Sequence, residues 1–502
     1  MSAPGEAPAE RGVTIDGPHT RDMDDALWVE RVPEGWRVTV CVADVARAVL
    51  PGSPEDARAC AMGATHYFAA GTSPMLPRAL GEGSLSLWPD GPRPALVLEA
   101  TLSPDLSGAR LDVRRGRVQS LVKLTYADVP RHVAHGGPEG DRPGPLGTML
   151  RAARDLAFAL CARRREAGAM ALYDLNHGWV TTEEGALRTF ADVRETVGHL
   201  IVQEVMVLAN RLLAEWAVAR ELPVLFRNHE GRATPTDRDD LARELAEAHL
   251  LDPERLEGLR RRTHLLVGRA RYGATARGHH GLALSAYLHG TSPLRRYADL
   301  VTHRQVLAAV AGEPLPYTRE ALEALAEHLH ELDEARRLSE GEAYKGRDEA
   351  LARRNIEARR LDGLNAASFE RATKLVVAAG GDPTPAFVEG FVSRVAGGRA
   401  PLLALTVAMV KAPRTAAWAP VFDACLTALA ARPEDGPSLL TQARQLDPAL
   451  PEPVVVATAV GPDHAREFTA TAAMQGAQGE GTGRKAREAE QWACVDLIAR
   501  WV

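Results

Sequence analysis

The pattern of apolar and polar positions along the chain changes at about residue 147. Before this point, short β-branched runs predict strands, and residues 36–45 (WRVTVCVADV) alternate as a single strand would. Two further runs of this kind lie at residues 13–15 and 95–102. After it, apolar residues recur at helical spacing in the segments 149–164, 195–222, 237–250, 293–310 and 318–361. Strands followed by helices predict an α+β fold.

The chain beyond residue 364 predicts two smaller domains. Residues 365–432 are rich in Ala, Leu and Val with Gly- and Pro-containing breaks, which predicts a bundle of short helices. Residues 433–436 are predicted to be a linker, and the segment from residue 437 predicts a C-terminal α-β-β-β-α domain. The small polar N-terminus is expected to be disordered. Because 502 residues are too many for one core, the expected divisions are 1–11, 12–364, 365–432 and 433–502.

Composition limits the class of protein. The formal net charge is −6, whereas a protein that coats nucleic acid with its whole surface is usually basic, so RNA binding would need local patches or an enclosed channel. The five cysteines contain no Cys-x-x-Cys pair, which argues against a zinc knuckle and a disulfide scaffold. The N-terminus lacks the apolar core of a signal peptide, and no apolar run is expected to span a bilayer. We expect a cytoplasmic protein without a membrane partner, and the sequence leaves its oligomeric state open.

Four carboxylates fall within ten residues near the start of the chain: Asp16, Asp22, Asp24 and Asp25. Like charges this close repel, and a divalent cation would remove the penalty of keeping them ionised. Oxygen-only ligands suit Mg²⁺ or Mn²⁺ better than zinc. The alternative is an ordinary acidic loop in which Asp22 caps a helix beginning at Asp24. These residues alone leave both interpretations open.

Further motifs follow the aspartates in the chain. The stretch T-I-D-x5-D-x-D-D-A-L resembles the signature of the RNB domain, the catalytic domain of the ribonuclease II/ribonuclease R family. The resemblance is extended by segments 42–45 (VADV), 74–78 (PMLPR), 84–87 (SLSL), 204–210 (EVMVLAN), 227–230 (RNHE) and 287–304 (containing HGTSPLRRYAD). It covers roughly residues 12–350. It implies an RNB-type catalytic domain, a mixed sheet surrounded by helices, that hydrolyses RNA from the 3′ end to nucleoside 5′-monophosphates.

The same resemblance implies metal-ion catalysis by the aspartates. Asp16, Asp22, Asp24 and Asp25 are expected to surround Mg²⁺, with Mn²⁺ as the alternative cofactor. Asp16, Asp22 and Asp25 are expected to be ligands, directly or through water, whereas Asp24 matches a residue that the family needs for cleavage. One or two metal ions would activate water and stabilise the leaving oxygen.

Three residues are candidates for contact with the reacting phosphate and the terminal nucleotide. Pro293 favours the start of a helix, which predicts Arg295 in its first turn, where the guanidinium can hold a phosphate and offset developing charge. Arg296 is a candidate for contact with the RNA backbone. Glu340 aligns with a family glutamate near the terminal nucleotide. The alternative for Arg295 is a solvated or salt-bridged arginine. The alternative for Glu340 is a position on the solvated face of a charged helix.

Two aromatic residues are candidates for contact with the single-stranded 3′ end of RNA in the catalytic channel. Tyr67 aligns with the family aromatic that stacks on the last base, an interaction that tolerates any sequence. Tyr126 aligns with a channel aromatic, and a buried structural tyrosine is the alternative. His229, His289 and His303 are expected to be framework residues with satisfied hydrogen bonds.

The C-terminal segment is similar to a double-stranded RNA-binding domain. In that family a Gly-Pro-Asp-His loop, here ending at His464, reaches a minor groove, and a basic helix start, here Arg484, Lys485 and Arg487, contacts phosphates. Residues 461–502 hold five Lys/Arg against six Asp/Glu, a net charge of −1, so weak binding of structured RNA is expected. Protein contact is the alternative.

Other functions stay open from the sequence. Members of the family usually carry cold-shock barrels before the catalytic domain and another RNA-binding barrel after it. Here the signature begins at residue 13, and residues 365–432 lack the strand pattern of the last barrel, so a more open RNA funnel is expected. One alternative is a catalytically weak or inactive RNA-binding protein of the same fold. Another is a hydrolase that acts on DNA or on very short RNAs.

Overall fold

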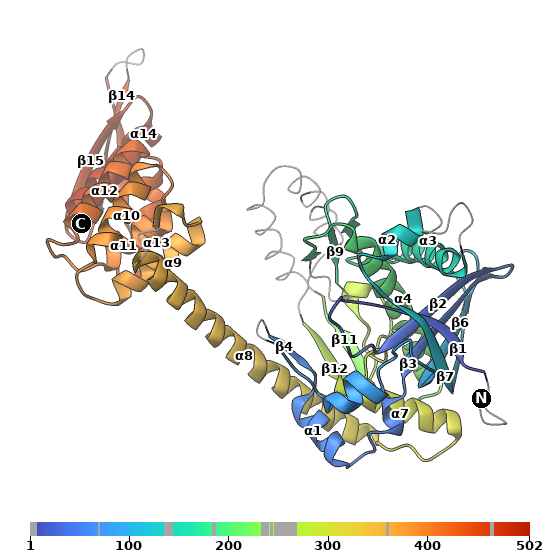
Figure 1. Ribbon diagram of the computed structural model, residues 1–502. Coiled ribbons are helices and arrows are strands. Elements are labelled where there is room, and N and C mark those ends of the chain that lie inside the picture. Colours follow the sequence, from blue (N-terminus) through green and yellow to red (C-terminus); the bar gives the residue numbers. More distant parts are fainter. Residues whose placement is uncertain are drawn as a thin grey trace. The chain divides into compact units, whose positions relative to one another are not determined.

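The computed structural model of the chain describes residues 8–68, 71–134, 144–182, 187–231, 240, 244, 269–357, 361–461 and 466–501 (Figure 1). The chain divides into two compact units, Met1–Arg336 and Arg337–Val502. The long helix α8 (Arg319–Glu357) contributes residues to both units.

A closed five-stranded barrel is the main sheet of the first unit. Its strands, in the order in which they pair, are β1 (Glu10–Asp16), β2 (Asp25–Val32), β3 (Gly35–Ala43), β6 (Arg93–Leu102) and β7 (Ala109–Thr125). Neighbouring strands are antiparallel, except that β7 closes the barrel by pairing with β1 in parallel. The β-branched and aliphatic side chains that favoured strands in the sequence, such as Val13, Val40 and Leu98, are fully buried.

The strands predicted from the sequence belong to this barrel. The runs at 13–15, 36–45 and 95–102 lie in β1, β3 and β6, although β3 ends at Ala43. Asp44 leaves the strand because its carboxylate caps a short helical turn by accepting the N–H of Arg47. Because β1 begins at Glu10, the prediction that residues 1–11 are disordered is wrong for the last two of them.

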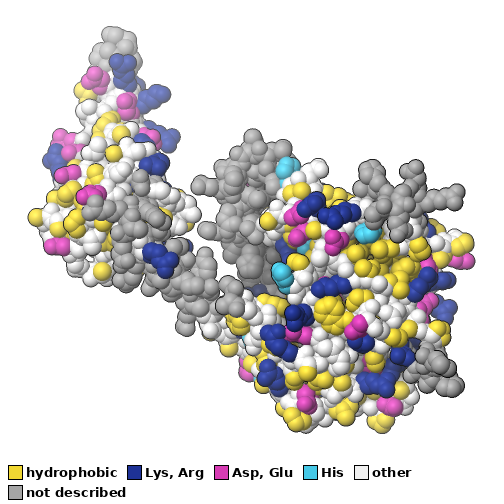
Figure 2. Space-filling view, in the orientation of Figure 1, with side chains coloured by type: hydrophobic (Ala, Val, Ile, Leu, Met, Phe, Trp, Pro, Cys, Tyr) yellow, Lys and Arg dark blue, Asp and Glu magenta, His cyan; other side chains and the backbone are white. Residues whose placement is uncertain are grey.

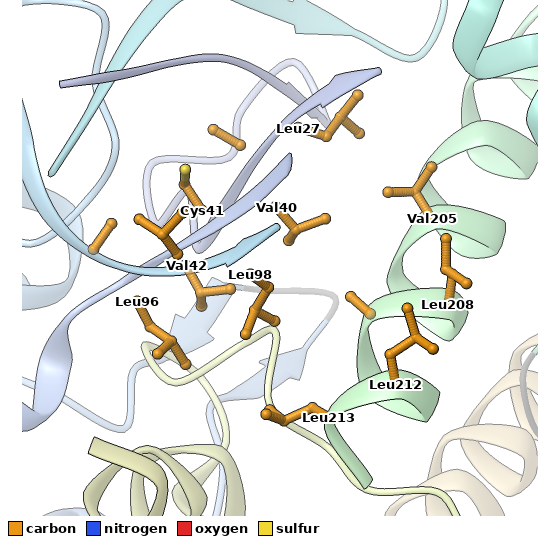
Figure 3. Packing of buried hydrophobic residues seen from close by; sticks show 14 of the residues in the cluster. Leu27, Val40, Cys41, Val42, Leu96, Leu98, Val205, Leu208, Leu212 and Leu213 are labelled. Carbon is orange, nitrogen blue, oxygen red and sulfur yellow. The ribbon is translucent and has the colours of Figure 1, made fainter. Parts of the chain in front are cut away.

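Helices cover the barrel and bury their apolar stripes. The helices α3 (Pro145–Glu166), α4 (Glu195–Val218) and α7 (Tyr297–Ala311) share one buried cluster with the barrel strands. Figure 3 shows Val205, Leu208 and Leu212 projecting from α4 toward the strands. The other elements of this unit are α1 (Pro54–Met62), β4 (His66–Phe68), β5 (Gly71–Ser73), α2 (Val129–Ala134), β8 (Tyr173–Asp174), β9 (Trp179–Thr181), β10 (Leu187–Thr189), β11 (Phe226–His229) and β12 (Ala270–Gly273).

The helix predicted at 293–310 begins later than expected. It starts at Tyr297, and Arg296 before it is extended, with φ −134° and ψ 123°, in a bridge with Ala64. The N–H of Leu294 is held by a distant carboxylate, that of Asp24, so the favourable start at Pro293 is overridden by tertiary contacts. The helix predicted at 237–250 lies outside the described residues except for 240 and 244.

Helix α4 corrects the expectation that no segment could span a bilayer. By length and composition it is the one helix among the described residues that meets this criterion. Within its most apolar window, 72% is buried inside the first unit. We interpret α4 as a core helix, since its apolar positions pack against the barrel.

In the second unit, a helical bundle and a small sheet share one core. Its helices and strands are α9 (Ala366–Ala378), α10 (Pro385–Ala396), α11 (Leu402–Lys411), α12 (Ala419–Ala431), α13 (Asp435–Leu446), β13 (Val454–Val460), β14 (Glu467–Met474), β15 (Ala477–Gly483) and α14 (Ala486–Trp501). Phe391 and Trp418 of the bundle belong to the same buried cluster as Leu497 of α14. The predicted bundle, the helix–three strands–helix order and the α+β fold class are confirmed.

The second half of one predicted linker belongs to a helix. Asp435 begins α13, and Gly436 is buried so closely that a Cβ there would lie 3.2 Å from Val495 and 3.3 Å from Cys494. Residues 433–436 are predicted to be a linker, but only the first two lie outside α13, and Gly436 allows α13 to approach α14. The expected boundaries after residues 364 and 432 stay predictions, although the helices on both sides of residue 432 share a core.

Helix α14 lies unusually close to β15. A Cβ on Gly479 would lie 2.1 Å from the backbone nitrogen of Leu497, and one on Gly481 would lie 2.2 Å from the carbonyl oxygen of Ala489. Glycine at these alternate positions of the strand therefore sets the distance between helix and sheet.

Candidate functional site

The four aspartates lie on one strand–loop–strand connection of the barrel. Asp16 ends β1, Asp25 begins β2, and Asp22 and Asp24 lie in the loop between them. The alternative in which Asp22 caps a helix beginning at Asp24 is wrong, because a strand begins at Asp25. The barrel thus holds both ends of the acidic segment.

The loop between these strands is tied to the rest of the unit. The side chain of Met23 is fully buried, and its N–H donates to Ser86 Oγ at 3.0 Å. Ser86 Oγ in turn donates to the carbonyl of Arg21 at 2.7 Å. Lys123 Nζ, from β7, donates to the carbonyl of Thr20. These bonds fix the loop backbone, so the positions of the carboxylates do not rest on loop residues alone.

The aspartates line one cavity. Its volume is about 480 Å³. Its wall contains the residues predicted from the aspartate segment and from three other parts of the first unit: Asp16, Asp22, Asp24, Asp25, Tyr67, Tyr126, Arg295 and Arg296. A shared metal site would be impossible if these carboxylates pointed apart into bulk water. They instead face a shared concave space.

The electrostatics of the cavity disfavour a full set of bare negative charges. Burial, with repulsion from Asp25 and Asp22, raises the pKa of Asp16 to about 7. Burial raises the pKa of Asp25 to about 6, against the attraction of Arg295. Burial also holds the pKa of Asp24 well above its usual value, although Arg295 opposes this. A bound cation would offset the penalty that these three carboxylates carry.

Asp24 is held differently from the other three aspartates. It is nearly fully buried, Oδ1 accepts the N–H of Leu294 at 2.7 Å, and Oδ2 lies 3.3 Å from Nε of Arg295. Both oxygens therefore contact the segment that carries Arg295. Asp16, Asp22 and Asp25 are only partly buried.

The donor set fits a hard divalent cation. Among the described residues, no group of three or more His, Cys, Asp or Glu side chains lies close enough together to hold a metal ion without water or substrate ligands. Mg²⁺ usually takes only one or two carboxylates and keeps several waters, so an open site with Asp16, Asp22 and Asp25 on its wall suits it. The choice of Mg²⁺ or Mn²⁺ stays a prediction.

Arg295 lies beside the aspartates but not on a helix. The prediction that it occupies the first helical turn is wrong, because residues 292–296 form a turn before α7. One guanidinium nitrogen, Nη2, donates to Ser292 Oγ at 2.9 Å, and the side chain stays 42% exposed. Neighbouring Arg296 instead forms a tight ion pair with buried Asp299, 2.9 Å from Nε to Oδ2.

The two candidate tyrosines have different surroundings. Tyr67 is 58% exposed on the β4–β5 hairpin, and its hydroxyl donates to Asp22 Oδ2 at 3.5 Å. Tyr126 stacks on His199 with ring centroids 3.5 Å apart, and His199 stacks on Phe190 at 4.3 Å. One face of the Tyr126 ring is therefore already occupied, whereas Tyr67 has exposed ring surface.

The three histidines expected to be framework residues are hydrogen-bonded and buried. His229 Nδ1 accepts the N–H of Gly281 at 2.9 Å, His289 Nδ1 contacts the Tyr272 hydroxyl at 2.7 Å, and His303 Nε2 donates to the carbonyl of Gly290 at 2.7 Å. The prediction of satisfied hydrogen bonds is wrong for one atom, because Nδ1 of His303 is buried without a hydrogen-bond partner among the described residues.

The remaining candidates lie in the second unit. Glu340 is in α8, and its side chain lies outside the described residues, as does all of His464. Arg484, Lys485 and Arg487 are exposed at the start of α14. On the face shown in Figure 2, Lys and Arg side chains lie in separate patches among acidic and hydrophobic ones, as the net charge led us to expect.

Sequence reasoning missed several residues that shape the cavity. Ser86 and Lys123 fix the aspartate loop, and Arg188, His199 and Gln203 line the cavity wall. Ser86 was visible only as part of the SLSL motif. Burial and the charge of Arg188 lower the pKa of His199 to about 3, so its ring is neutral in the stack.

Comparisons with known proteins point to one family. The sequence profile described as the RNB domain matches residues 9–312. Ribonuclease R of Vibrio parahaemolyticus is 31% identical over 326 residues, which are 60% of this chain and 38% of the relative. The chain thus spans about two fifths of the length of this relative.

Solved structures share the fold at low sequence identity. Mycoplasma genitalium RNase R in complex with double-stranded RNA matches with a TM-score of 0.53 and 21% identity, over 70% of this chain and 66% of that one. Yeast Ssd1, described as a pseudonuclease, matches with a TM-score of 0.51 and 20% identity, over 66% of this chain and 44% of that one.

Proposed function

The chain belongs to the RNB domain family, and on this premise we propose that it is a metal-dependent 3′→5′ exoribonuclease that releases nucleoside 5′-monophosphates stepwise. The observation that carries the proposal is the cavity that brings Asp16, Asp22, Asp24 and Asp25 together with Arg295. Ribonuclease R relatives support the reaction class.

The residues of the cavity divide the work of cleavage between them. Asp16, Asp22 and Asp25 hold Mg²⁺, with Mn²⁺ as an alternative. When bound, the ion supplies an activated water and stabilises the leaving oxygen. Arg295, on a turn held by Asp24, offsets the charge that develops on the phosphate. Tyr67 offers an exposed ring to the terminal base next to Asp22.

Asp24 acts on the phosphate through Arg295 in this proposal. An asparagine at position 24 would still accept the Leu294 N–H but would lose the charge that attracts Arg295. Asp24→Asn should therefore keep the fold and lower the rate of cleavage more than it changes RNA affinity.

A product time-course tests the function. Wild type with Mg²⁺ and a 5′-labelled RNA oligomer should give a ladder that shortens from the 3′ end. The same oligomer labelled at its 3′ end should release labelled mononucleotide from the first time point. Asp24→Asn should lose this activity, whereas Asp112→Asn, at an exposed aspartate of β7, should retain it. DNA oligomers of equal length should remain intact. A wild type that leaves RNA uncut, or a variant as active as wild type, would overturn the proposal.

An inactive RNA-binding protein is the second candidate, because the pseudonuclease Ssd1 shares the fold. This candidate expects RNA binding without shortening of the oligomer at any concentration of Mg²⁺ or Mn²⁺. The same time-course, run beside a gel-shift measurement with the same RNA, distinguishes the two.

We also propose that the second unit contacts structured RNA through Arg484, Lys485 and Arg487, which are exposed at one helix start. Because the helices on both sides of residue 432 share a core, reversing these charges is a better test than deleting the sequence after it. A triple change to Glu should slow degradation of RNA with a duplex region more than that of short single strands. Equal loss on both substrates contradicts this assignment.

A further inference from the structure

One strand of the second unit has an unprotected edge. The three-stranded sheet has the order β13-β14-β15, so β13 pairs with β14 on one side and with no described strand on the other. Every second residue of an edge strand directs an unpaired N–H and C=O outward. Val454, Val456 and Val460 of this strand are 62%, 53% and 56% exposed.

The strand at the opposite edge of the same sheet is in contact with a helix. Helix α14 packs directly on β15, where Gly479 and Gly481 allow the close approach. Asp496 of that helix accepts the backbone N–H of Glu480 through Oδ2 at 2.8 Å, so a strand donor is satisfied by a side chain. Helix α14 thus covers one face of β15 and satisfies one backbone donor of this strand.

The sequence of β13 contains none of the features that usually prevent edge pairing. Its seven residues, VVVATAV, include no charge and no proline. Its register with β14 is unbroken from Val454–Ala473 to Val460–Glu467, so no bulge distorts the edge. Long, regular and hydrophobic edges of this kind pair with another strand. Pro453 precedes the strand and limits its length.

We propose that β13 is a homodimerisation strand that pairs in antiparallel register with β13 of a second copy of this chain. A two-fold axis at Ala457 places Val454 opposite the partner's Val460 and Val456 opposite the partner's Thr458. The two three-stranded sheets then join into one sheet of six. Each pair of residues is repeated by symmetry, as in an isologous interface.

The chemistry of the strand favours a copy of itself over another partner. A neutral strand meets no like charge when it pairs with itself, and its β-branched residues form favourable cross-strand pairs. It also carries no charge that could select a different protein. In the register centred on Ala457, whichever alternate residues point outward find their counterparts, so the unpaired backbone groups of both edges are satisfied.

The oligomeric state of the full chain tests this inference. Sedimentation velocity over a range of protein concentrations should show wild type passing from monomer to dimer. Val456→Lys places a lysine on the edge strand, a residue that sheets use to prevent edge pairing, and it should raise the dimer dissociation constant by more than about tenfold. Leu50→Lys is the matched control, since Leu50 is a 59% exposed aliphatic residue of the first unit, and it should dimerise as wild type does.

Three results would overturn the proposal. Wild type could stay monomeric at every concentration, Val456→Lys could dimerise as tightly as wild type, or Leu50→Lys could abolish the dimer. Circular dichroism of Val456→Lys guards against a fold defect, because this side chain is exposed and the monomer should melt as wild type does.

A cross-link tests the register independently of affinity. Ala457→Cys would place two thiols on the two-fold axis, where paired Cα atoms lie about 4.5–5.5 Å apart, within disulfide range. Mild oxidation should give a covalent dimer, whereas Thr427→Cys, on exposed helix surface of the same unit, should give none. Equal cross-linking of both variants would contradict the register. Neither measurement depends on whether the chain degrades RNA.

Discussion

The two sheets of this protein differ in whether they leave a strand edge with unpaired backbone groups. In the first unit, β7 returns to pair with β1, so the barrel is closed and has no free edge. In the second unit, the sheet stays open at β13. Closure gives a rigid frame that can hold four carboxylates against their mutual repulsion, whereas the open edge keeps backbone groups available for another chain.

The two units also differ in the kind of unfavourable interaction that they contain. In the barrel unit it is electrostatic, since burial raises the pKa of Asp16, Asp24 and Asp25 around one cavity. In the open sheet it is hydrogen bonding and exposed apolar surface, at Val454 and Val456. The partners that we propose for the two regions differ accordingly: a cation with RNA for the cavity and a strand for the open edge.

The largest expected effect is the removal of divalent metal. Chelation with EDTA should abolish release of mononucleotide, because the aspartates of the cavity then have no cation to share, and Mg²⁺ should restore it. Thermal melting of the second unit should not change, since the proposed site lies in the first. Full activity in EDTA would contradict the role given to the aspartates.

Arg295→Lys should have the next largest effect. A lysine cannot reproduce the fork that contacts Ser292 and Asp24, so kcat should fall by about 10²–10³-fold. Steady-state kinetics on a short oligomer measures this. Arg110→Lys, at an exposed position of β7, is the control, and an equal loss in both variants would mean that the effect is not local to the cavity.

Gly481→Ala should sharpen the comparison by damaging only the second unit. The added Cβ would meet the carbonyl oxygen of Ala489 at 2.2 Å, so α14 would have to move away from β15. The free energy of unfolding of this unit should fall by about 1–3 kcal/mol, as read from urea denaturation. Gly381→Ala, where a Cβ meets nothing within 4 Å, should leave it unchanged, and cleavage of short RNA should persist in both.

The smallest effect comes from making one substitution in both sheets. Val40→Thr buries a hydroxyl in the barrel and should cost about 1–3 kcal/mol. Val456→Thr places it on the exposed edge and should change monomer stability by less than about 0.5 kcal/mol. Denaturation at low protein concentration measures both values. Equal costs would show that β13 is not exposed in solution.

Local patterns in the sequence predicted much of the fold and part of the site. The aspartate segment was found because its four carboxylates lie within ten residues, and β1, β3 and β6 because their β-branched runs are buried in the barrel. The bundle between residues 365 and 432 was found because Gly and Pro mark the ends of its helices.

What the sequence did not predict depends on residues distant along the chain. Pro293 favours a helix start, but Asp24 binds the Leu294 N–H from 270 positions away, so α7 begins at Tyr297. The hydrogen bond from the N–H of Met23 to Ser86 Oγ joins residues that are 63 positions apart. Gly436 lies in a segment whose composition is typical of a linker. Its close packing depends on Cys494 and Val495 of α14, which are distant in the sequence. No local pattern contains this information.

The bond between Leu294 and Asp24 has a consequence for synthesis of the chain. Because the two residues are separated by 270 positions, the ribosome must complete more than half of the protein before Arg295 can dock beside the acidic loop. Contacts of such long range also form slowly. A truncated or still growing polypeptide therefore lacks the assembled cavity, so the RNA cleavage that we propose could begin only after translation has passed this point.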